Sequence, residues 1–238
     1  MTKLYQRTVA KAITATGIGL HSGKKVTLTL SPAKPNTGII FERTDIGATV
    51  PMAAELVQDT MMSSNLVLGD ARIGTVEHLL SAIAAYGLDN LITQVNASET
   101  PIMDGSAAPF LYLIDQAGIT EQDELKKFIK IISPIEVNDG DKWARLEPYD
   151  KGFLLDFEID FNHAAIAATE QTTQLDFNTA NFAAEVGQAR TFGFLKDIEY
   201  LQKNNLALGG SLDNAVVLDE NSVVNQDGLR YPNEFVRH

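Results

Sequence analysis

The spacing of apolar residues predicts strands in the first part of the chain. Apolar and polar residues alternate over 25–30, as in a strand that buries one face, and a turn at 19–23 precedes this segment. A second apolar run begins at Ile39, and residues 90–95 form a third. We therefore expect several strands here, joined by polar turns.

Two other segments have helical spacing. Apolar residues of 75–87 fall on one face of a helix, with Thr75 as its N-cap and Gly87 as a left-handed C-terminal residue. Residues 107–116 predict a second helix, which follows a turn at 104–106.

The second half repeats part of this order. Residues 127–137 predict a strand and 138–141 a hairpin turn. The strand pair that follows, at 142–146 and 152–155, resembles the pair beginning at Lys25 and Gly38. The similarity suggests an internal duplication, although short hairpins also resemble one another by chance.

A third similarity favours duplication. Val76-Glu77-His78 has a counterpart in Val236-Arg237-His238, so the second half would contain an insertion at about 192–230. The insertion predicts a helix and two strands, at 194–203, 215–218 and 222–224.

The predicted fold class is therefore α+β, with two similar two-layer α/β sandwich domains related by duplication. We place them at 1–122 and 123–238. A helix predicted to start near Asn233, as its cap, reaches only His238, the last residue. We expect the chain to be truncated, so that the second domain lacks its C-terminal part; a natural frayed end is the alternative.

Composition excludes several classes of protein. The chain has 19 Lys+Arg against 31 Asp+Glu, a net charge of −12, which disfavours nucleic acid as a partner. It has no cysteine, so a metal would need His or carboxylate ligands. The most apolar stretch, 76–86, is too short to span a membrane, and the N-terminus lacks the apolar core of a signal peptide. We expect a cytoplasmic protein.

Glu77-His78 is the best local candidate for a chemical site. At a helix N-terminus the dipole favours the carboxylate and disfavours protonation of the imidazole, which leaves it neutral as a metal requires. When a Glu-His sequence occurs without further motifs, it is more often a capping glutamate beside a half-buried histidine. Duplicated domains, however, would bring His78 and His238 to one cleft, as in a zinc hydrolase.

Longer motifs carry a specific resemblance, which runs from about Tyr5 to the last residue. The chain resembles the zinc-dependent UDP-3-O-acyl-N-acetylglucosamine deacetylase family of lipid A biosynthesis. The motifs are Thr75-Val76-Glu77-His78-Leu79, Pro101-Ile102-Met103-Asp104-Gly105-Ser106-Ala107-Ala108-Pro109-Phe110, Asp139-Gly140-Asp141-Lys142-Trp143, Ala189-Arg190-Thr191-Phe192-Gly193-Phe194 and Glu234-Phe235-Val236-Arg237-His238.

The resemblance implies a hydrolase that removes the N-acetyl group from a UDP-linked, 3-O-acylated glucosamine and releases acetate. It implies Zn²⁺ as cofactor, with His78 and His238 as ligands. Water activated by zinc would attack with Glu77 as base, and the Thr191 hydroxyl would stabilise the oxyanion.

The resemblance also implies a binding site for each end of the substrate. Lys142 would contact the diphosphate, Asp160 and Phe161 would hold the uracil, and His21 would border the same cleft. A solvated lysine, a core phenylalanine and a turn histidine are the respective alternatives. The insertion would form an apolar passage for the acyl chain, with these candidate residues: Phe192, Phe194, Ile198, Ala207, Leu212, Ala215 and Val217.

The chain departs from the family pattern at its end. The family motif continues past the final His to an aspartate that is the third zinc ligand, and to a later histidine that assists catalysis. We therefore expect these 238 residues to be inactive or nearly so, and we expect the protein to be a monomer. A non-catalytic fragment that keeps the UDP-sugar pocket is the main alternative; a different two-domain α/β hydrolase that shares the Glu-His helix is a weaker one.

Overall fold

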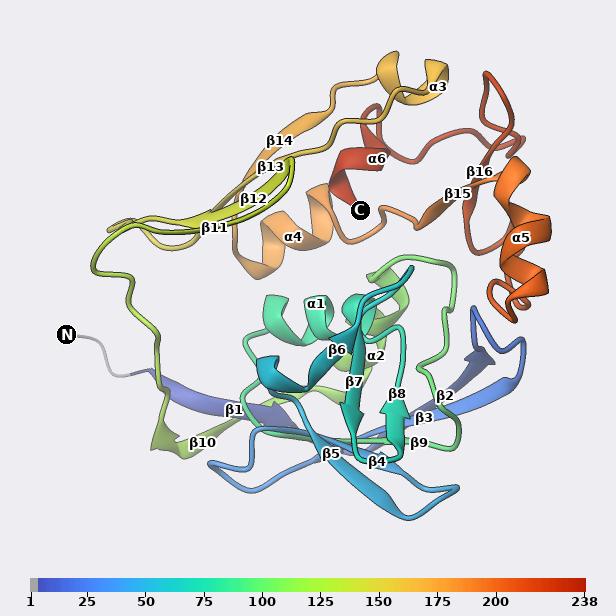
Figure 1. Cartoon of the computed structure of the whole chain (residues 1–238). Helices are drawn as coiled ribbons and strands as arrows, with labels where there is room; N and C mark the ends of the chain where they lie inside the picture. Colours follow the sequence, from blue (N-terminus) through green and yellow to red (C-terminus); the bar gives the residue numbers. More distant parts are fainter. Residues whose placement is uncertain (1–3) are drawn as a thin grey trace.

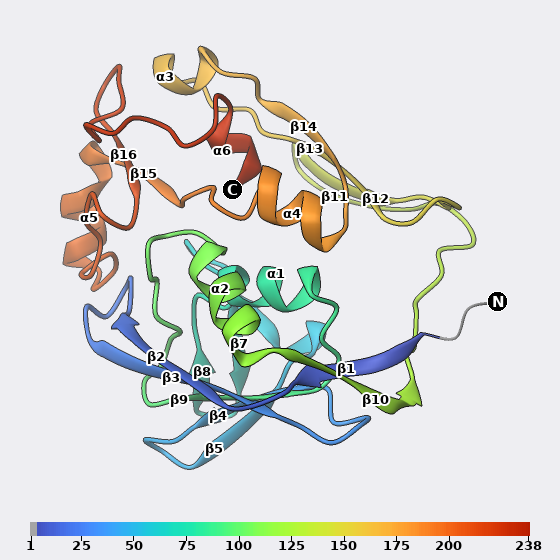
Figure 2. The same cartoon turned by 180° about the vertical axis from the view of Figure 1, so that it is seen from behind.

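The computed structural model describes residues 4–238, apart from the side chains of Asp59 and Glu199. The fold is mixed α and β, and two halves face each other across a central layer of helices (Figure 1). Seen from behind, α4 and α6 of the second half lie above α1 and α2 of the first (Figure 2).

A five-stranded sheet forms the base of the first half, in the order β2-β3-β9-β4-β5. Its strands are Ile13–Ile18, Lys25–Pro32, Leu91–Val95, Ile39–Arg43 and Ala48–Pro51, in that order. Only β4 and β9 are parallel neighbours. The alternation predicted at 25–30 is confirmed, because Val26, Leu28 and Leu30 are fully buried.

Helices α1 (Glu77–Ala85) and α2 (Ala108–Ala117) supply the other layer of this half. Their apolar faces pack on the sheet in one continuous core, which includes Leu79, Phe110 and Ile114. The remaining strands of this half are β1 (Tyr5–Val9) paired with β10 (Ile119–Leu125), and the group β6 (Val57–Asp59), β7 (Asn65–Leu68) and β8 (Ala71–Ile73), which follows the short helix η1 (Ala54–Leu56).

The second half consists of short strands and short helices. Two antiparallel hairpins pair β11 (Ile135–Asp139) with β12 (Lys142–Leu146), and β13 (Leu154–Glu158) with β14 (Thr172–Asp176). The parallel pair β15 (Phe192–Phe194) and β16 (Val216–Leu218) flanks the insertion. The helices are α3 (Ala164–Ala167), α4 (Thr179–Glu185), η2 (Leu195–Asp197), α5 (Ile198–Lys203) and α6 (Glu234–Arg237).

Several local predictions were wrong. Thr75 does not cap α1: it has a left-handed φ of 56°, and its hydroxyl lies 3.4 Å from a carboxylate oxygen of Glu99. Asn233 does precede α6, but its side chain accepts a hydrogen bond from Arg237 instead of capping the helix. The strand expected at 127–137 begins only at Ile135, and that at 222–224 is a single bridge between Leu218 and Val223.

The duplication remains a prediction. Strands β3 and β4 of the first half belong to one large sheet, whereas β12 and β13 lie in separate two-stranded hairpins. Within residues 4–238, none of the helices has both the length and the apolar character to cross a bilayer.

Candidate active site

Two imidazoles from opposite halves meet at the centre of the molecule. His78 lies in the first turn of α1 and His238 follows α6; their ring centroids are 5.0 Å apart and the planes are tilted by 57°. The prediction that the two helices bring these histidines together is therefore confirmed by geometry.

Burial disfavours protonation of both imidazoles. Burial and the neighbouring His238 lower the pKa of His78 to about 3, against a backbone hydrogen bond with Ser106 and the charge of Asp104. Burial of the imidazole lowers the pKa of His238 as well, against a backbone hydrogen bond with Ala189 and the charge of Glu234. Neutral imidazoles with a backbone partner are the form in which histidines bind metals.

Glu77 stands beside this pair. One carboxylate oxygen lies 4.0 Å from Nε2 of His78, and the other accepts a hydrogen bond of 2.9 Å from the backbone N–H of Ser64. Burial raises the pKa of Glu77, although backbone hydrogen bonds from Glu77 and Ser64 oppose the rise. A carboxylate with a raised pKa is better matched to proton transfer near neutral pH.

Glu77, His78 and His238 line a cleft of about 230 Å³ between the halves. Its lining combines them with mostly apolar neighbours: Ser81, Ala107, Phe182, Val186, Ala189 and Arg237. Among residues 4–238 no group of three or more His, Asp or Glu could hold a metal ion. The donors present thus fit two ligand positions of a metal site.

The segment after β14 brings further predicted residues to the same region. The ring of Phe192 lies 6.5 Å from that of His238 and 5.4 Å from that of Phe161. Thr191 is fixed between the halves, since its N–H donates to the carbonyl of Gly105 and its own carbonyl accepts from Val216. Phe161 and Phe194 pack against the small core around β16. This packing is consistent with the alternative that Phe161 is a core phenylalanine.

Other predicted residues lie apart from the imidazoles. Lys142 is exposed at the tip of the β11–β12 hairpin, opposite Asp139, and Asp160 is also exposed. The proposed passage residues are spread over the insertion: Ile198, Ala207, Ala215 and Val217 are half-buried, and Leu212 is 48% exposed.

His21 belongs to a second region, where the insertion docks on the first half. Its carbonyl accepts from Leu208, its Nδ1 lies 3.4 Å from the N–H of Ala207, and its N–H donates to the buried carboxylate of Glu99. This junction borders a separate cavity of about 140 Å³, which His21 and Glu99 help to line.

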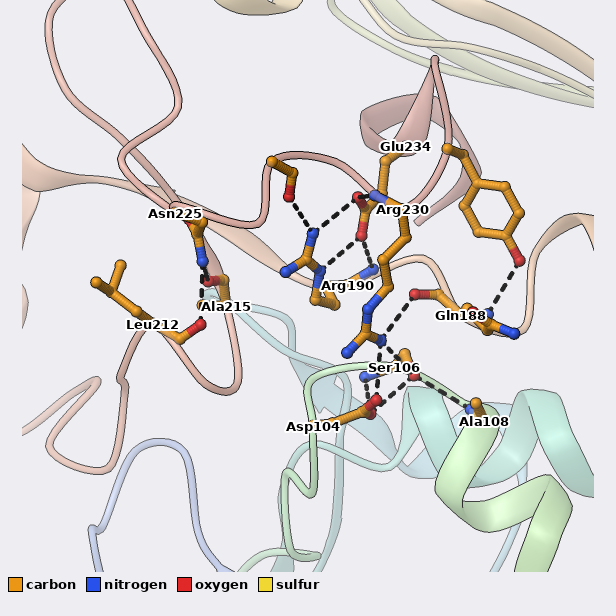
Figure 3. A network of polar contacts seen from close by, with 12 residues as sticks. Asp104, Ser106, Ala108, Gln188, Arg190, Leu212, Ala215, Asn225, Arg230 and Glu234 are labelled. Atoms are coloured by element: carbon orange, nitrogen blue, oxygen red, sulfur yellow. Dashed lines mark hydrogen bonds and ion pairs between the residues drawn. The ribbon is translucent and has the colours of Figure 1, made fainter.

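Sequence reasoning missed the polar groups that support the site. Glu234 looked like an acid in a helix first turn, but it is fully buried and paired with Arg190 (Figure 3). Asp104 looked like a turn residue, yet it forms an ion pair with Arg230 of the other half. The only indication in the sequence was that Glu234 and Asp104 lie inside the family motifs. This indication did not reveal which charged groups form pairs.

Comparisons with known proteins agree on one family. The family model described as UDP-3-O-acyl N-acetylglycosamine deacetylase matches residues 6–238. A UDP-3-O-acyl-N-acetylglucosamine deacetylase from Psychrobacter arcticus is 60% identical and aligns with 100% of this chain and 74% of its own length. Enzymes of the same name from Idiomarina loihiensis and Shewanella frigidimarina are 57% and 55% identical, over 98% and 99% of this chain and 77% and 78% of theirs. The chain therefore belongs to the UDP-3-O-acyl N-acetylglycosamine deacetylase family.

Proposed function

We propose that the site serves the hydrolysis of the N-acetyl group of UDP-3-O-(hydroxyacyl)-N-acetylglucosamine, with release of acetate, in lipid A synthesis in the cytoplasm. The observation that carries the proposal is the contact of His78 and His238 across the cleft, with Glu77 at 4.0 Å from His78. Two neutral imidazoles and a carboxylate suit metal-assisted hydrolysis.

His78 and His238 would hold zinc. When bound, zinc supplies Lewis acidity for the amide carbonyl and acidifies water. Glu77, oriented by the Ser64 N–H, takes the proton from the attacking water. The Thr191 hydroxyl donates to the developing oxyanion from a backbone fixed on Gly105.

The rest of the substrate would contact the second half. Lys142 binds the diphosphate, while Asp160 and Phe161 hold the uracil. The acyl chain enters the insertion past Phe192 and Phe194 and is bounded by Ile198, Ala207, Leu212, Ala215 and Val217, with His21 at the margin. Each methylene buried there contributes about 0.8 kcal/mol. In this proposal residues 1–122 and 123–238 act as two domains of a monomer.

Two protein ligands are fewer than the three that catalytic zinc sites use, so we expect the 238 residues alone to bind zinc weakly and to deacetylate very slowly. Robust deacetylation by the purified chain would contradict this expectation.

A zinc competition titration tests the site itself. His78→Ala and His238→Ala should each abolish measurable zinc binding, whereas His163→Ala should not. His163 is a suitable control because it caps α3 and contacts the carbonyl of Asp219. Equal zinc affinity in all four proteins would exclude the proposed site, and UDP binding without any zinc uptake would favour a non-catalytic UDP-sugar module.

A further inference from the structure

A buried ion pair joins Arg190 to Glu234, the first residue of the helix that His238 follows. Nε and Nη2 of Arg190 lie 2.9 and 3.1 Å from the two carboxylate oxygens of Glu234, and the Arg190 backbone N–H donates to the same carboxylate. Arg190 is 5% exposed and Glu234 0%. Charges so deeply buried require good geometry and full pairing, which these contacts supply.

A second ion pair connects this one to the other half. The backbone N–H of Arg230 also donates to Glu234, and its guanidinium lies 2.8 Å from Asp104 of the first half. Asp104 in turn accepts from the N–H and the hydroxyl of Ser106. We call Asp104, Arg190, Arg230 and Glu234 the brace; all four are seen in Figure 3.

The two ends of the brace reach residues that line the cleft together with the two imidazoles. Ala107, which follows the Ser106 that Asp104 orients, lines the cleft with His78. Ala189, which precedes Arg190, lines it with His238. Between them, the N–H of Thr191 donates to the carbonyl of Gly105 at 2.8 Å.

We propose that the brace sets the spacing and orientation of His78 and His238 across the interface of the halves. Its members are positioning residues: they act through Ser106 and Ala189 and need no contact with the substrate. The consequence for metal affinity rests on the proposed zinc site; the geometric claim does not. Groups that orient metal-binding histidines typically change metal affinity by about 10–100-fold when mutated.

A purely structural ion pair would behave differently, and the chain offers a matched control. Asp45 pairs with Arg43 at 2.7 Å and is 34% exposed at its side chain, against 2.8 Å and 33% for Asp104. Arg43 and Asp45 lie within the first half and do not join it to the second. Asp45→Asn therefore removes a comparable charge without touching the brace.

Histidine NMR of the metal-free 238-residue chain is the first test, since only four histidines contribute signals. We expect a ring-to-ring NOE between His78 and His238 in the wild type and in Asp45→Asn, and its loss in Asp104→Asn. Arg230→Gln should also lose the NOE, as Asp104→Asn does. Arg230→Lys should retain the NOE, because the lysine keeps a positive charge near Asp104. Retention of the NOE in Asp104→Asn, or its loss in Asp45→Asn as well, would overturn the proposal.

Zinc titration is the second test. Asp104→Asn should weaken zinc binding about 10–100-fold and Asp45→Asn less than about threefold. Equal weakening by the two substitutions would overturn the link to metal affinity. If the NOE is lost and kept in the variants as expected but the wild type binds no zinc, the proposed zinc site is wrong and the proposed role of the brace is supported.

Discussion

The two halves carry similar alternating strands but bury them very differently. In the first half Val26, Leu28 and Phe41 are at most 1% exposed, because α1 and α2 cover the sheet. In the hairpins of the second half Trp143 is 66% exposed and Phe157 54%. Alternation specifies a strand with two faces, whereas burial requires a second layer on one of them.

The site lies where these unequal halves meet. His78 comes from the well-packed half and His238 from the half with the small core of Ile166, Val216, Leu218 and Phe235. Helix α6 is held by polar contacts with Glu185, Arg190 and Arg230 of its own half. This region is joined to the first half by the ion pair of Arg230 with Asp104 and by the hydrogen bond from Thr191 to Gly105.

Truncation of one large aromatic residue in each half should give the largest contrast. Phe41→Ala, on strand β4 of the five-stranded sheet, should lower the free energy of unfolding by about 3–5 kcal/mol, since it leaves a cavity. Phe157→Ala should cost less than about 1 kcal/mol, because the ring is already half in water. Urea denaturation of both variants measures the difference. Equal losses would mean that the hairpin face is buried in solution.

Added methyl groups at two glycines should sharpen the comparison. Gly105 has φ +82°, and a Cβ there would lie 2.0 Å from the carbonyl oxygen of Asn214, so Gly105→Ala should destabilise by about 2–4 kcal/mol. Gly140 has φ +63° in the open hairpin turn, with nothing within 4 Å of the added carbon. Gly140→Ala should cost only the conformational strain, about 1 kcal/mol. Thermal unfolding of the pair measures both; a larger loss at Gly140 would contradict the contrast.

The sequence predicted the parts of the molecule that depend on local patterns. Strand β3, the C-terminal Gly87 of α1 with its φ of 59°, and the hairpin turn between β11 and β12 are of this kind. The meeting of His78 and His238 was also predictable, from the expectation that duplicated domains bring equivalent helices to one cleft. The ion pairs of Glu234 and Asp104 were not, because a carboxylate at a helix start or in a turn satisfies local rules without a distant partner.

Ion pairs should differ between the halves in their dependence on pH. The hydrogen bond from Arg43 lowers the pKa of Asp45 below 3.8, with a further contribution from the charge of Arg43 and with burial opposing both. This contribution to stability is fully present above pH 3.8 and is lost as the pH falls through the lowered pKa. Because Asp45 is about a third exposed, solvent screening limits the loss in Asp45→Asn to about 1 kcal/mol at neutral pH.

The matched pair in the second half is Arg145 with Glu136, 3.7 Å apart and 44% and 45% exposed. Glu136→Gln should change the free energy of unfolding by less than about 0.3 kcal/mol, because both side chains are largely exposed to solvent. Urea denaturation from acid to neutral pH distinguishes the two cases. If the curve of Asp45→Asn stays parallel to that of the wild type down to the lowest pH, the inferred role of the Arg43 hydrogen bond is wrong.

A small effect on stability is also expected where apolar side chains of the second half face water. Val137 and Trp143 are 63% and 66% exposed on the β11–β12 hairpin. The double substitution Val137→Thr and Trp143→Thr keeps two residues suited to strands, so the free energy of unfolding should change by less than about 0.5 kcal/mol. Exposed apolar area binds fluorescent hydrophobic dyes and promotes association, so dye binding and light scattering should both fall. Val26→Thr should behave in the opposite way, because Val26 is fully buried. We expect this substitution to cause a large loss of stability and an increase in dye binding. Stability that fell as far in the hairpin variant as in Val26→Thr would show that the two halves are equally well packed, and the contrast between them would be lost.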